Sequence, residues 1–517
     1  MLAPPSAIDH DTLRIPTLSP ERAEAAALRC RGANVDGCDV IVPWTDWNAE
    51  ALAILGEQAV SPVLRDFDFP GPYKPFPHQI TMVNDQVVNR RFFNLAAMGV
   101  GKTSGSIWAA MYLLQVGAIK NVLVISPVST MVETWATGFF EHTMQQANVI
   151  YGSTKATKVK KAINTTVFNI INYDGVVALN KELLRTQFDL IIVDELRTYG
   201  NAGTARWKAI AKLIRPETRV WGLTGTPRSR SPLDCHGMVK LLNPGNIVSS
   251  VHRWKMQVMQ QYGEWDWRER PEANAMCAAA MQPGRVVSKA EVMKHLPPLT
   301  FSYVPVPLSS QQLSYYHELR KQKLVKTDGG ADITAVNAAV LVNKLAQVAA
   351  GVVYDEEGNA QVFDVSGRMD ELLRLCDESL SGTIVFAPYK HTCDLIMLKL
   401  GPLGYRKITG DVSLSERTEI FEKVQAGEIP GVVAIPSTMS HGIDLSGAST
   451  TIWWSAINST EVFEQASARM DRGSQKHPMS VYMLYGSAVE RKMYQQRQGQ
   501  GGSQQELLAM FNNFIGG

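Results

Sequence analysis

Two series of short apolar, β-branched runs constrain the fold of this chain more than any other feature. The first series consists of FFNLA (92–96), NVLVIS (121–126), VFNIIN (167–172), DLIIVD (189–194) and RVWGLTG (219–225). The second consists of TIVFAP (383–388), GVVAIP (431–436), TTIWWS (450–455) and SVYMLY (480–485). Strands that are apolar on both faces are typical of parallel sheets covered by helices on both sides. Because helical stretches separate the runs, the sequence predicts two α/β domains.

Changes of composition along the chain predict the domain boundaries. We expect a small accessory domain at 1–66, with one strand in CDVIVPW and one helix in WNAEALAILGEQ. The first α/β domain is expected at 67–295, and its last part, about 232–295, is predicted to be a mainly helical, tryptophan-rich insertion. The second α/β domain is expected at 296–490. Residues 491–517 are low in complexity and are expected to form a flexible tail.

The composition excludes some classes of protein. Lys and Arg number 51 against 49 Asp and Glu, a net charge of +2, which excludes a histone-like polycation but not a local basic groove. The six cysteines form no C-x-x-C pair, which favours reduced thiols in a cytosolic protein over disulfides or a zinc site. No apolar run reaches about 18 residues, and the polar start is unlike a secretory signal, so we expect no membrane segment.

A glycine-rich loop between the strand 92–96 and a following helical pattern predicts a phosphate-binding site. Glycines allow backbone N–H groups to surround a phosphate, and the helix N-terminus adds partial positive charge. A lysine then reaches the β- and γ-phosphates, and a Ser or Thr hydroxyl binds Mg²⁺. The loop residues are Met98, Gly99, Val100, Gly101, Lys102, Thr103 and Ser104. Ala96 replaces the first glycine of the usual pattern, and a chance glycine-rich turn is the alternative.

Two adjacent carboxylates end the apolar run DLIIVD. Asp194 stands where a carboxylate can hold Mg²⁺ beside a nucleotide, and Glu195 where one can orient or deprotonate the attacking water. The alternative is an acidic helix start. Since the glycine-rich loop lies in the same predicted domain, the two motifs together predict an ATPase that uses ATP and Mg²⁺.

Residues 70–490 resemble the superfamily-two helicases and translocases, in their Swi/Snf-like branch, and are most similar to the DEAD/DEAH-box-type DNA helicases encoded by bacteriophages. The resemblance rests on motifs in the family's order: PHQ ending at 79, AAMGVGKT, SPVSTMVETW (126–135), INYD (171–174), DELR, LTGTP (223–227), GDVSLSERTEIF (410–421), STMSHGIDLSGAS (437–449) and EQASARMDRGSQ (464–475). It implies two RecA-like P-loop domains, each a parallel sheet flanked by helices, with ATP between them.

The resemblance also implies roles for individual residues. Gln79 would read adenine, Asp444 and Gln465 would join the loop residues around the nucleotide, Thr103 and Asp194 would bind the metal, and Arg469 and Arg472 would reach the phosphates as arginine fingers. Contacts to the nucleic-acid backbone are expected from Ser126, Pro127, Thr130, Trp135, Thr226, Ser437, Thr438 and His441. Ordinary turn chemistry is the alternative for each of these eight.

Some residues depart from the family's pattern. Leu196 and Arg197 replace the usual small residue and His or Asp after Asp-Glu, and Ser474 stands where a glycine is usual. These changes leave the phosphate, metal and water-handling groups in place. Trp254, Trp265 and Trp267 favour core packing of the insertion over base stacking or a strand-separating wedge.

The sequence therefore predicts an ATP-driven enzyme that moves on DNA, contacts its backbone rather than its sequence, and unwinds, anneals or remodels forked or branched structures. Replication, recombination and repair are all compatible, with proteins of those processes as partners and the cytoplasm, that of the host for a viral protein, as the location. The alternatives are an RNA helicase and a weakly hydrolysing nucleotide-binding scaffold.

Overall fold

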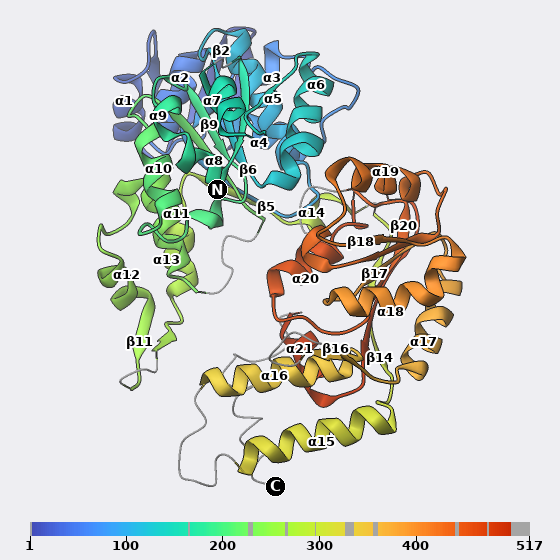
Figure 1. Ribbon diagram of the computed structural model, residues 1–517. Helices are drawn as coiled ribbons and strands as arrows, with labels where there is room; N and C mark the ends of the chain where they lie inside the picture. The colour runs from blue at the N-terminus through green and yellow to red at the C-terminus, as the bar shows by residue number, and fades with distance from the viewer. Residues whose placement is uncertain are drawn as a thin grey trace. The chain divides into compact units, whose positions relative to one another are not determined.

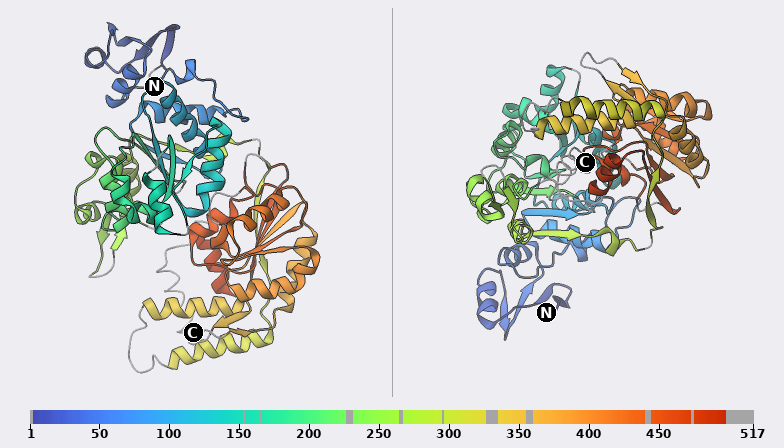
Figure 2. Two further views of the ribbon diagram at one scale, coloured as in Figure 1. Left: turned by 45° about the horizontal axis from the view of Figure 1, so that its top comes forward. Right: turned by 90° about the horizontal axis from the view of Figure 1, so that it is seen from below.

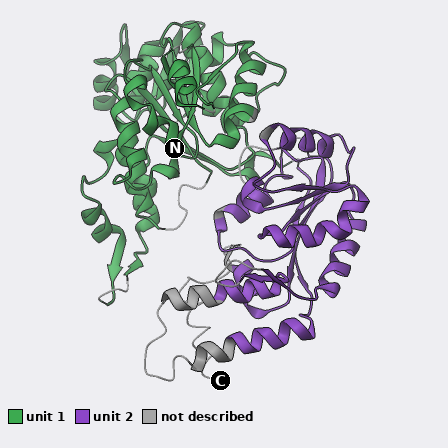
Figure 3. Ribbon diagram, viewed as in Figure 1, with its two compact units in different colours: residues 1–294 green, residues 295–517 purple. Residues whose placement is uncertain are grey.

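A computed structural model describes residues 3–152, 154–163, 166–225, 231–263, 267–294, 296–325, 335–354, 360–439, 444–472 and 475–497. The chain divides into two compact units, Met1–Lys294 and His295–Gly517, which Figure 3 colours separately. Among the described residues, none of the helices combines the length and apolarity that a membrane crossing requires.

A parallel sheet of seven strands forms the centre of the first unit, in the order β13-β5-β10-β9-β6-β8-β7 (Figure 1). The strands are β5 Arg91–Ala96, β6 Val122–Ser126, β7 Asn148–Val149, β8 Phe168–Asn172, β9 Leu190–Val193, β10 Arg219–Leu223 and β13 Gly284–Val287. The helices are α3 Val63–Asp66, α4 Pro77–Val88, α5 Lys102–Gln115, α6 Thr137–Thr143, α7 Lys155–Ile163, α8 Tyr173–Ala178, α9 Asn180–Leu183 and α10 Ala205–Leu213. All five runs of the first series form strands of this sheet.

Alternate residues of each strand enter two separate cores. In β9, Leu190 and Ile192 pack with residues of α4, α5 and α6, whereas Ile191 and Val193 pack with residues of α8, α10 and the later helix α11 (Asp234–Leu242). This burial on both faces is the reason that the runs are apolar throughout. Figure 2 shows the strands lying between helices.

Residues 232–294 combine helices with strands. The helices are α11, α12 Val251–Val258, α13 Ala273–Ala280 and α14 Lys289–Val292, and β11 Met259–Gln261 pairs with β12 Trp267–Glu269 as an antiparallel hairpin. The prediction of a mainly helical insertion did not anticipate this hairpin, nor β13, which joins the main sheet beside β5. The run GRVV was missed because it is short and half of it is exposed. Trp254 is buried, and its Nε1 donates to the Pro232 carbonyl at 2.9 Å.

The first residues of the chain form a separate antiparallel sheet in the order β1-β2-β4-β3. Its strands are β1 Ser6–Asp9, β2 Thr12–Pro16, β3 Asn34–Asp36 and β4 Asp39–Pro43, and its helices are α1 Pro20–Ala27 and α2 Asp46–Ile54. The sequence predicted β4 and α2 but not β2, whose Leu13 and Ile15 are buried, nor β1 and β3, which are short and exposed.

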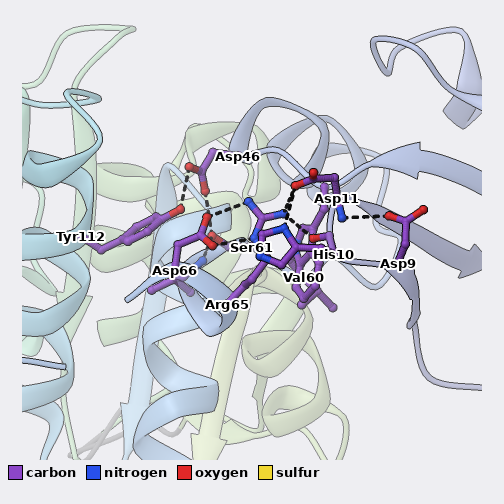
Figure 4. Close-up of polar contacts among 11 residues, drawn as sticks. Asp9, His10, Asp11, Asp46, Val60, Ser61, Arg65, Asp66 and Tyr112 are labelled. Atoms are coloured by element: carbon purple, nitrogen blue, oxygen red, sulfur yellow. Dashed lines mark hydrogen bonds and ion pairs between the residues drawn. The ribbon is translucent and has the colours of Figure 1, made fainter. Parts of the chain in front are cut away.

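Buried polar contacts join this small sheet to the seven-stranded one. The Asp46 carboxylate accepts hydrogen bonds from Ser61 Oγ at 2.8 Å and from Tyr112 Oη, on α5, at 2.9 Å (Figure 4). Glu50 forms an ion pair with Arg219, the first residue of β10. The small sheet is therefore bound both to the helix that follows the glycine-rich loop and to β10, an inner strand of the neighbouring sheet.

The second unit is built on a parallel sheet of six strands in the order β14-β21-β20-β17-β19-β18. Its strands are β14 Leu299–Pro305, β17 Gly382–Phe386, β18 Arg406–Ile408, β19 Gly431–Ala434, β20 Ala448–Trp453 and β21 Met479–Tyr485, and β15 Val352–Tyr354 pairs with β16 Ala360–Val362 apart from it. The helices are α15 Ser310–Val325, α16 Ala335–Ala349, α17 Ser366–Asp377, α18 Lys390–Leu400, α19 Leu414–Gln425, α20 Thr460–Ser467 and α21 Ala488–Arg497. Two parallel sheets flanked by helices confirm the predicted fold class.

A buried ion pair joins α17 to α21 in this second unit. The guanidinium of Arg368 binds both carboxylate oxygens of Glu490, at 3.0 and 3.1 Å, and also donates to the Trp454 carbonyl at 2.8 Å. The two side chains are 3% and 0% exposed. Removing one partner would leave the other charge buried without compensation.

We therefore expect Arg368→Met to destabilise the second unit by about 3–5 kcal/mol. Hydrogen exchange of β17 and β20 peptides in the whole chain measures this change. Arg374→Met is the matched control, because Arg374 lies on the same helix in an exposed pair with Glu371 and should leave the exchange unchanged. Equal effects of the two substitutions would contradict the expectation.

Candidate functional site

The glycine-rich loop joins the end of β5 to the start of α5, as the sequence predicted. Gly99 and Gly101 have φ values of 79° and 82°, a region that favours glycine, and Gly101 is the N-cap of α5. Lys102 folds back over the loop, and its Nζ donates to the carbonyls of Ala96 at 2.7 Å and Ala97 at 2.9 Å. The ammonium group and the backbone N–H groups at the start of α5 thus lie at one end of the sheet, where they can bind phosphate oxygens.

The start of α4 packs against the same loop. The side chain of Gln79 is buried; its Oε1 accepts the Phe76 N–H at 2.8 Å, and its Nε2 lies 3.5 Å from the Gly101 carbonyl. His78 Nε2 lies 2.9 Å from the Val100 carbonyl. A Cβ on residue 101 would lie 1.8 Å from Gln79 Nε2, so the close contact requires glycine there.

Asp194 follows the last residue of β9, and both of its carboxylate oxygens have donors. Oδ1 accepts the Glu195 N–H at 3.0 Å, and Oδ2 accepts the indole N–H of Trp135 at 3.0 Å. Burial raises the pKa of Asp194, and this rise is opposed by the Trp135 hydrogen bond, the charge of Lys102 and the Glu195 N–H. Lys102 and Asp194 are therefore brought into electrostatic contact from segments 92 residues apart.

Glu195 has a left-handed backbone conformation, with φ 46° and ψ 54°. Such a conformation in a residue other than glycine costs about 1–3 kcal/mol and is concentrated at functional sites. The guanidinium of Arg197 lies 4.0 Å from the Glu195 carboxylate, and its side chain is 8% exposed. Arg197, which departs from the family's pattern, is thus the basic neighbour of the predicted catalytic base.

The residues present suit a magnesium ion held beside a nucleotide. No group of three or more His, Cys, Asp or Glu side chains suited to a metal occurs in the described part of the chain. Mg²⁺ is commonly bound by one or two carboxylates together with substrate phosphates rather than by such a group. Asp194 and the Thr103 hydroxyl would supply the protein ligands, and the ion would offset phosphate charge when bound.

The residues of the segment 126–135 that were predicted to contact nucleic acid are buried in the structure. Ser126, Thr130 and Trp135 are 0%, 4% and 0% exposed, and Pro127 is also buried. The hydroxyls of Ser126 and Thr130 donate to the Pro127 carbonyl, at 3.3 and 3.1 Å. Trp135 in particular does not present its ring to a ligand, because its ring is in the core and its one donor is bound to Asp194.

In the second unit, the predicted nucleotide residues gather at the end of α20. Arg469 is 3% exposed, and its Nε donates to the Gln465 carbonyl at 2.8 Å. The Arg469 carbonyl accepts the N–H of Leu445, the residue after Asp444. Burial lowers the pKa of Arg472, and the charge of Asp444 opposes that effect. The segments around 444 and 465–472 are thus brought together within this unit.

The remaining predicted nucleic-acid contacts lie partly outside the described residues. Ser437 is exposed and Thr438 half-buried, with Thr438 Oγ1 donating to the Ile435 carbonyl at 2.7 Å. Thr226 and His441 lie outside the described residues, as do Trp265 and Ser474.

One residue near the site was missed by the sequence analysis. The hydroxyl of Tyr173, which begins α8, donates to the Asp194 carbonyl at 3.0 Å. Burial and the nearby charges of Asp194 and Glu195 raise the pKa of Tyr173. The motif INYD was recognised, but nothing in the sequence shows which way its tyrosine points. The position of Tyr173 directly after β8 could have indicated that it lies near Asp194, because parallel strands end at the same edge of the sheet.

Comparisons with known proteins agree with this geometry. Residues 95–349 match the SNF2-related domain, and residues 367–474 match the helicase conserved C-terminal domain. Protein p41 of Acyrthosiphon pisum secondary endosymbiont phage 1 is 24% identical over 461 residues, which cover 84% of this chain and 98% of that protein.

Eukaryotic relatives are longer than this chain. SWI/SNF-related matrix-associated actin-dependent regulator of chromatin subfamily A-like protein 1 of Xenopus tropicalis is 24% identical over 75% of this chain and 40% of its own length. DNA repair and recombination protein RAD54B of Gallus gallus is 22% identical over 79% of this chain and 51% of its own length. Among solved structures, the Sulfolobus solfataricus SWI2/SNF2 ATPase core in complex with dsDNA has a TM-score of 0.42 at 20% identity, covering 83% of this chain and 91% of that one.

The contact between Gly101 and Gln79 leads to a testable prediction. Gly101→Ala should weaken ATP binding at least about tenfold, because the added methyl group would displace Gln79 and the loop. Equilibrium titration with a fluorescent ATP analogue measures the affinity. Gly117→Ala is the matched control, since Gly117 also has a positive φ, 73°, just past the other end of α5, and no atom lies within 4 Å of the added methyl. Both variants should lose similar stability, and only the first should lose affinity; equal ATP affinities would refute this account of the loop.

Proposed function

Because the chain belongs to the Swi/Snf-like branch of the superfamily-two helicases and translocases, whose members are ATP-hydrolysing, DNA-dependent enzymes, we propose that it is a motor that unwinds, anneals or remodels forked or branched DNA. The observation that carries the proposal is the convergence of Lys102, Asp194 and the N-terminus of α5 at one end of the parallel sheet. The Sulfolobus solfataricus SWI2/SNF2 ATPase core was solved in complex with double-stranded DNA. For the present chain, DNA as the binding partner is part of the proposal.

The proposed chemistry assigns a role to each group. Lys102 and the N–H groups of α5 bind the phosphates of ATP, and Glu195 accepts a proton from the attacking water. Arg469 and Arg472 offset the charge on the transferred phosphoryl group. Thr103 and Asp194 bind Mg²⁺, Gln79 contacts the adenine, and Asp444 and Gln465 complete the nucleotide set. Ser437 and Thr438 are retained as contacts to the DNA backbone, since Ser437 is exposed.

The biological setting is also proposed. Similarity to a phage protein along 98% of its length supports a virus-encoded enzyme that acts in the host cytoplasm. The relative named for DNA repair and recombination supports a role in those processes, together with replication or recombination proteins. We propose domain boundaries at 66, 295 and 490, and a tail at 491–517.

A weakly hydrolysing scaffold is the second candidate, and one observation favours it. The guanidinium of Arg197 lies 4.0 Å from the Glu195 carboxylate, and an ion pair there would hold the group that is proposed to accept the proton of the attacking water. Arg197→His would then raise ATP turnover. If the chain is instead a motor with full ATPase activity, Arg197→His should lower ATP turnover or leave it unchanged.

ATPase assays with single-stranded, duplex, forked and four-way DNA, with RNA as comparison, test the proposal when paired with a strand-displacement assay. We expect stimulation by DNA that is larger for forked or four-way substrates. Binding should weaken steeply with salt, because backbone contacts release counterions. ATP turnover at the background rate with every nucleic acid would contradict the proposal that the chain is a motor. Stimulation of ATP turnover by RNA alone would show that its nucleic-acid partner is RNA and not DNA.

Two substitutions test the proposed roles in this assay. Lys102→Ala should lose both ATP affinity and turnover, whereas Glu195→Gln should keep ATP affinity and lose turnover by a factor of about 10²–10⁴. Lys399→Ala is the control, since Lys399 is an exposed residue of α18 in the other unit and should change neither quantity. Normal turnover in Lys102→Ala would show that the site is assigned wrongly.

A further inference from the structure

We propose that Trp135 is a positioning residue for the carboxylate of Asp194, and that through it the segment 127–136 controls how this carboxylate holds a divalent cation. The inference deepens the proposed function and rests on it for the role of Asp194. It assigns Trp135 to the nucleotide side of the protein rather than to the DNA.

The first support is the geometry around the carboxylate. An indole has one donor and no acceptor, so the hydrogen bond of 3.0 Å to Oδ2 commits the whole polar capacity of Trp135 to Asp194. Oδ1 is bound at the same time by the Glu195 N–H. With one donor on each oxygen the plane of the carboxylate is fixed, and each oxygen keeps a lone pair for an ion or its water. Partners of this kind orient metal ligands and tune metal affinity.

The second support is the packing of the indole. Trp135 is 0% exposed, and its ring lies 6.1 Å from that of Phe139, which stacks at 4.2 Å on Phe168 of β8. A ring held in this way has no room to rotate alone. The position of its N–H group therefore follows the backbone of its own segment.

The third support is the form of that segment. Met131–Ala136 is a π-helix, a rare conformation that often marks functional sites, and the 3₁₀ turn Val128–Thr130 precedes it. A change from π to α winding would rotate Trp135 relative to Asp194. A movement of the backbone of this segment would therefore shift the hydrogen bond from Trp135 to Asp194.

A second aromatic donor holds the backbone of Asp194 from a neighbouring segment. Tyr173 donates to the Asp194 carbonyl, and the next residue, Asp174, is bound by both Nε and Nη2 of Arg206, at 2.7 and 2.8 Å. The motif segments 126–135 and 171–174 therefore each have an aromatic donor bound to Asp194.

Trp135→Phe tests the proposal in the full-length protein, because it keeps a buried ring and removes the donor. We expect the affinity of the ADP complex for Mn²⁺, measured without DNA by electron paramagnetic resonance, to fall by about tenfold or more. Trp221→Phe is the matched control. Trp221 is equally buried in the same core, and its Nε1 donates to the Asn89 carbonyl at 3.2 Å. The control should keep the Mn²⁺ affinity within about twofold of the wild type.

The kinetic readout separates positioning from DNA contact. In Trp135→Phe the Mg²⁺ concentration for half-maximal ATPase activity should rise about tenfold, while the affinity for DNA should stay unchanged. Wild-type Mn²⁺ affinity in Trp135→Phe, equal losses in both tryptophan variants, or a loss of DNA affinity with unchanged metal dependence would each overturn the proposal.

Two further outcomes keep the test decisive. If Trp135→Phe does not fold, Tyr173→Phe removes only the other donor's hydroxyl, and it should weaken Mn²⁺ binding in the same direction by a smaller factor; unchanged binding would count against the arrangement. If the wild type shows no DNA-stimulated ATPase, the proposed function fails, whereas the Mn²⁺ comparison still decides the role of Trp135.

Discussion

The carboxylate of Asp194 is buried, and the candidate site depends on how that burial is compensated. A carboxylate removed from water is unstable as an anion unless donors or positive charges surround it. Here the indole of Trp135, the N–H of Glu195 and the charge of Lys102 provide the compensation, and burial still leaves the pKa of Asp194 raised. A bound divalent cation would add to this compensation. The site is therefore preorganised at the expense of local stability, which the two apolar cores of the same sheet offset.

A parallel sheet explains why groups so distant in sequence meet. The strands β5, β6, β8, β9 and β10 all run in one direction, so the residues that follow them share one edge. This much could be predicted, because strands buried on both faces appear in the sequence as apolar runs. Lys102 and Asp194 were placed correctly at strand ends for that reason. The sequence did not predict that Trp135 and Tyr173, which follow strands of the sheet, donate hydrogen bonds to Asp194. The π-helix and the packing of aromatic rings that orient these two side chains leave no periodic pattern in the sequence.

Three of the strands that the sequence analysis missed share a different property. The strands β1 and β3 are exposed along their whole length, and in β13 only the last residue is buried, so no apolar pattern marks them. They exist because a neighbouring strand offers hydrogen-bonding groups, which is a tertiary effect. The small sheet they help to build is bound to α5 and β10 by Asp46 and Glu50. Acidic residues in a short unit look like ordinary surface charge until their partners in the rest of the chain are known.

The residues after Asp-Glu show how one substitution can require another. Leu196 is fully buried, and a Cβ on Gly222 would lie 2.5 Å from its Cδ2, so the leucine occupies space that the glycine of β10 leaves open. Gly222 is paired in register with Val193, the last residue of β9. A larger residue in β10 would push Leu196 and the turn at Glu195, whose backbone is already left-handed. The departure from the family's pattern is thus accommodated by packing beneath the turn rather than by the catalytic groups themselves. The turn at Glu195, next to Asp194, therefore rests on the contact between Leu196 and Gly222.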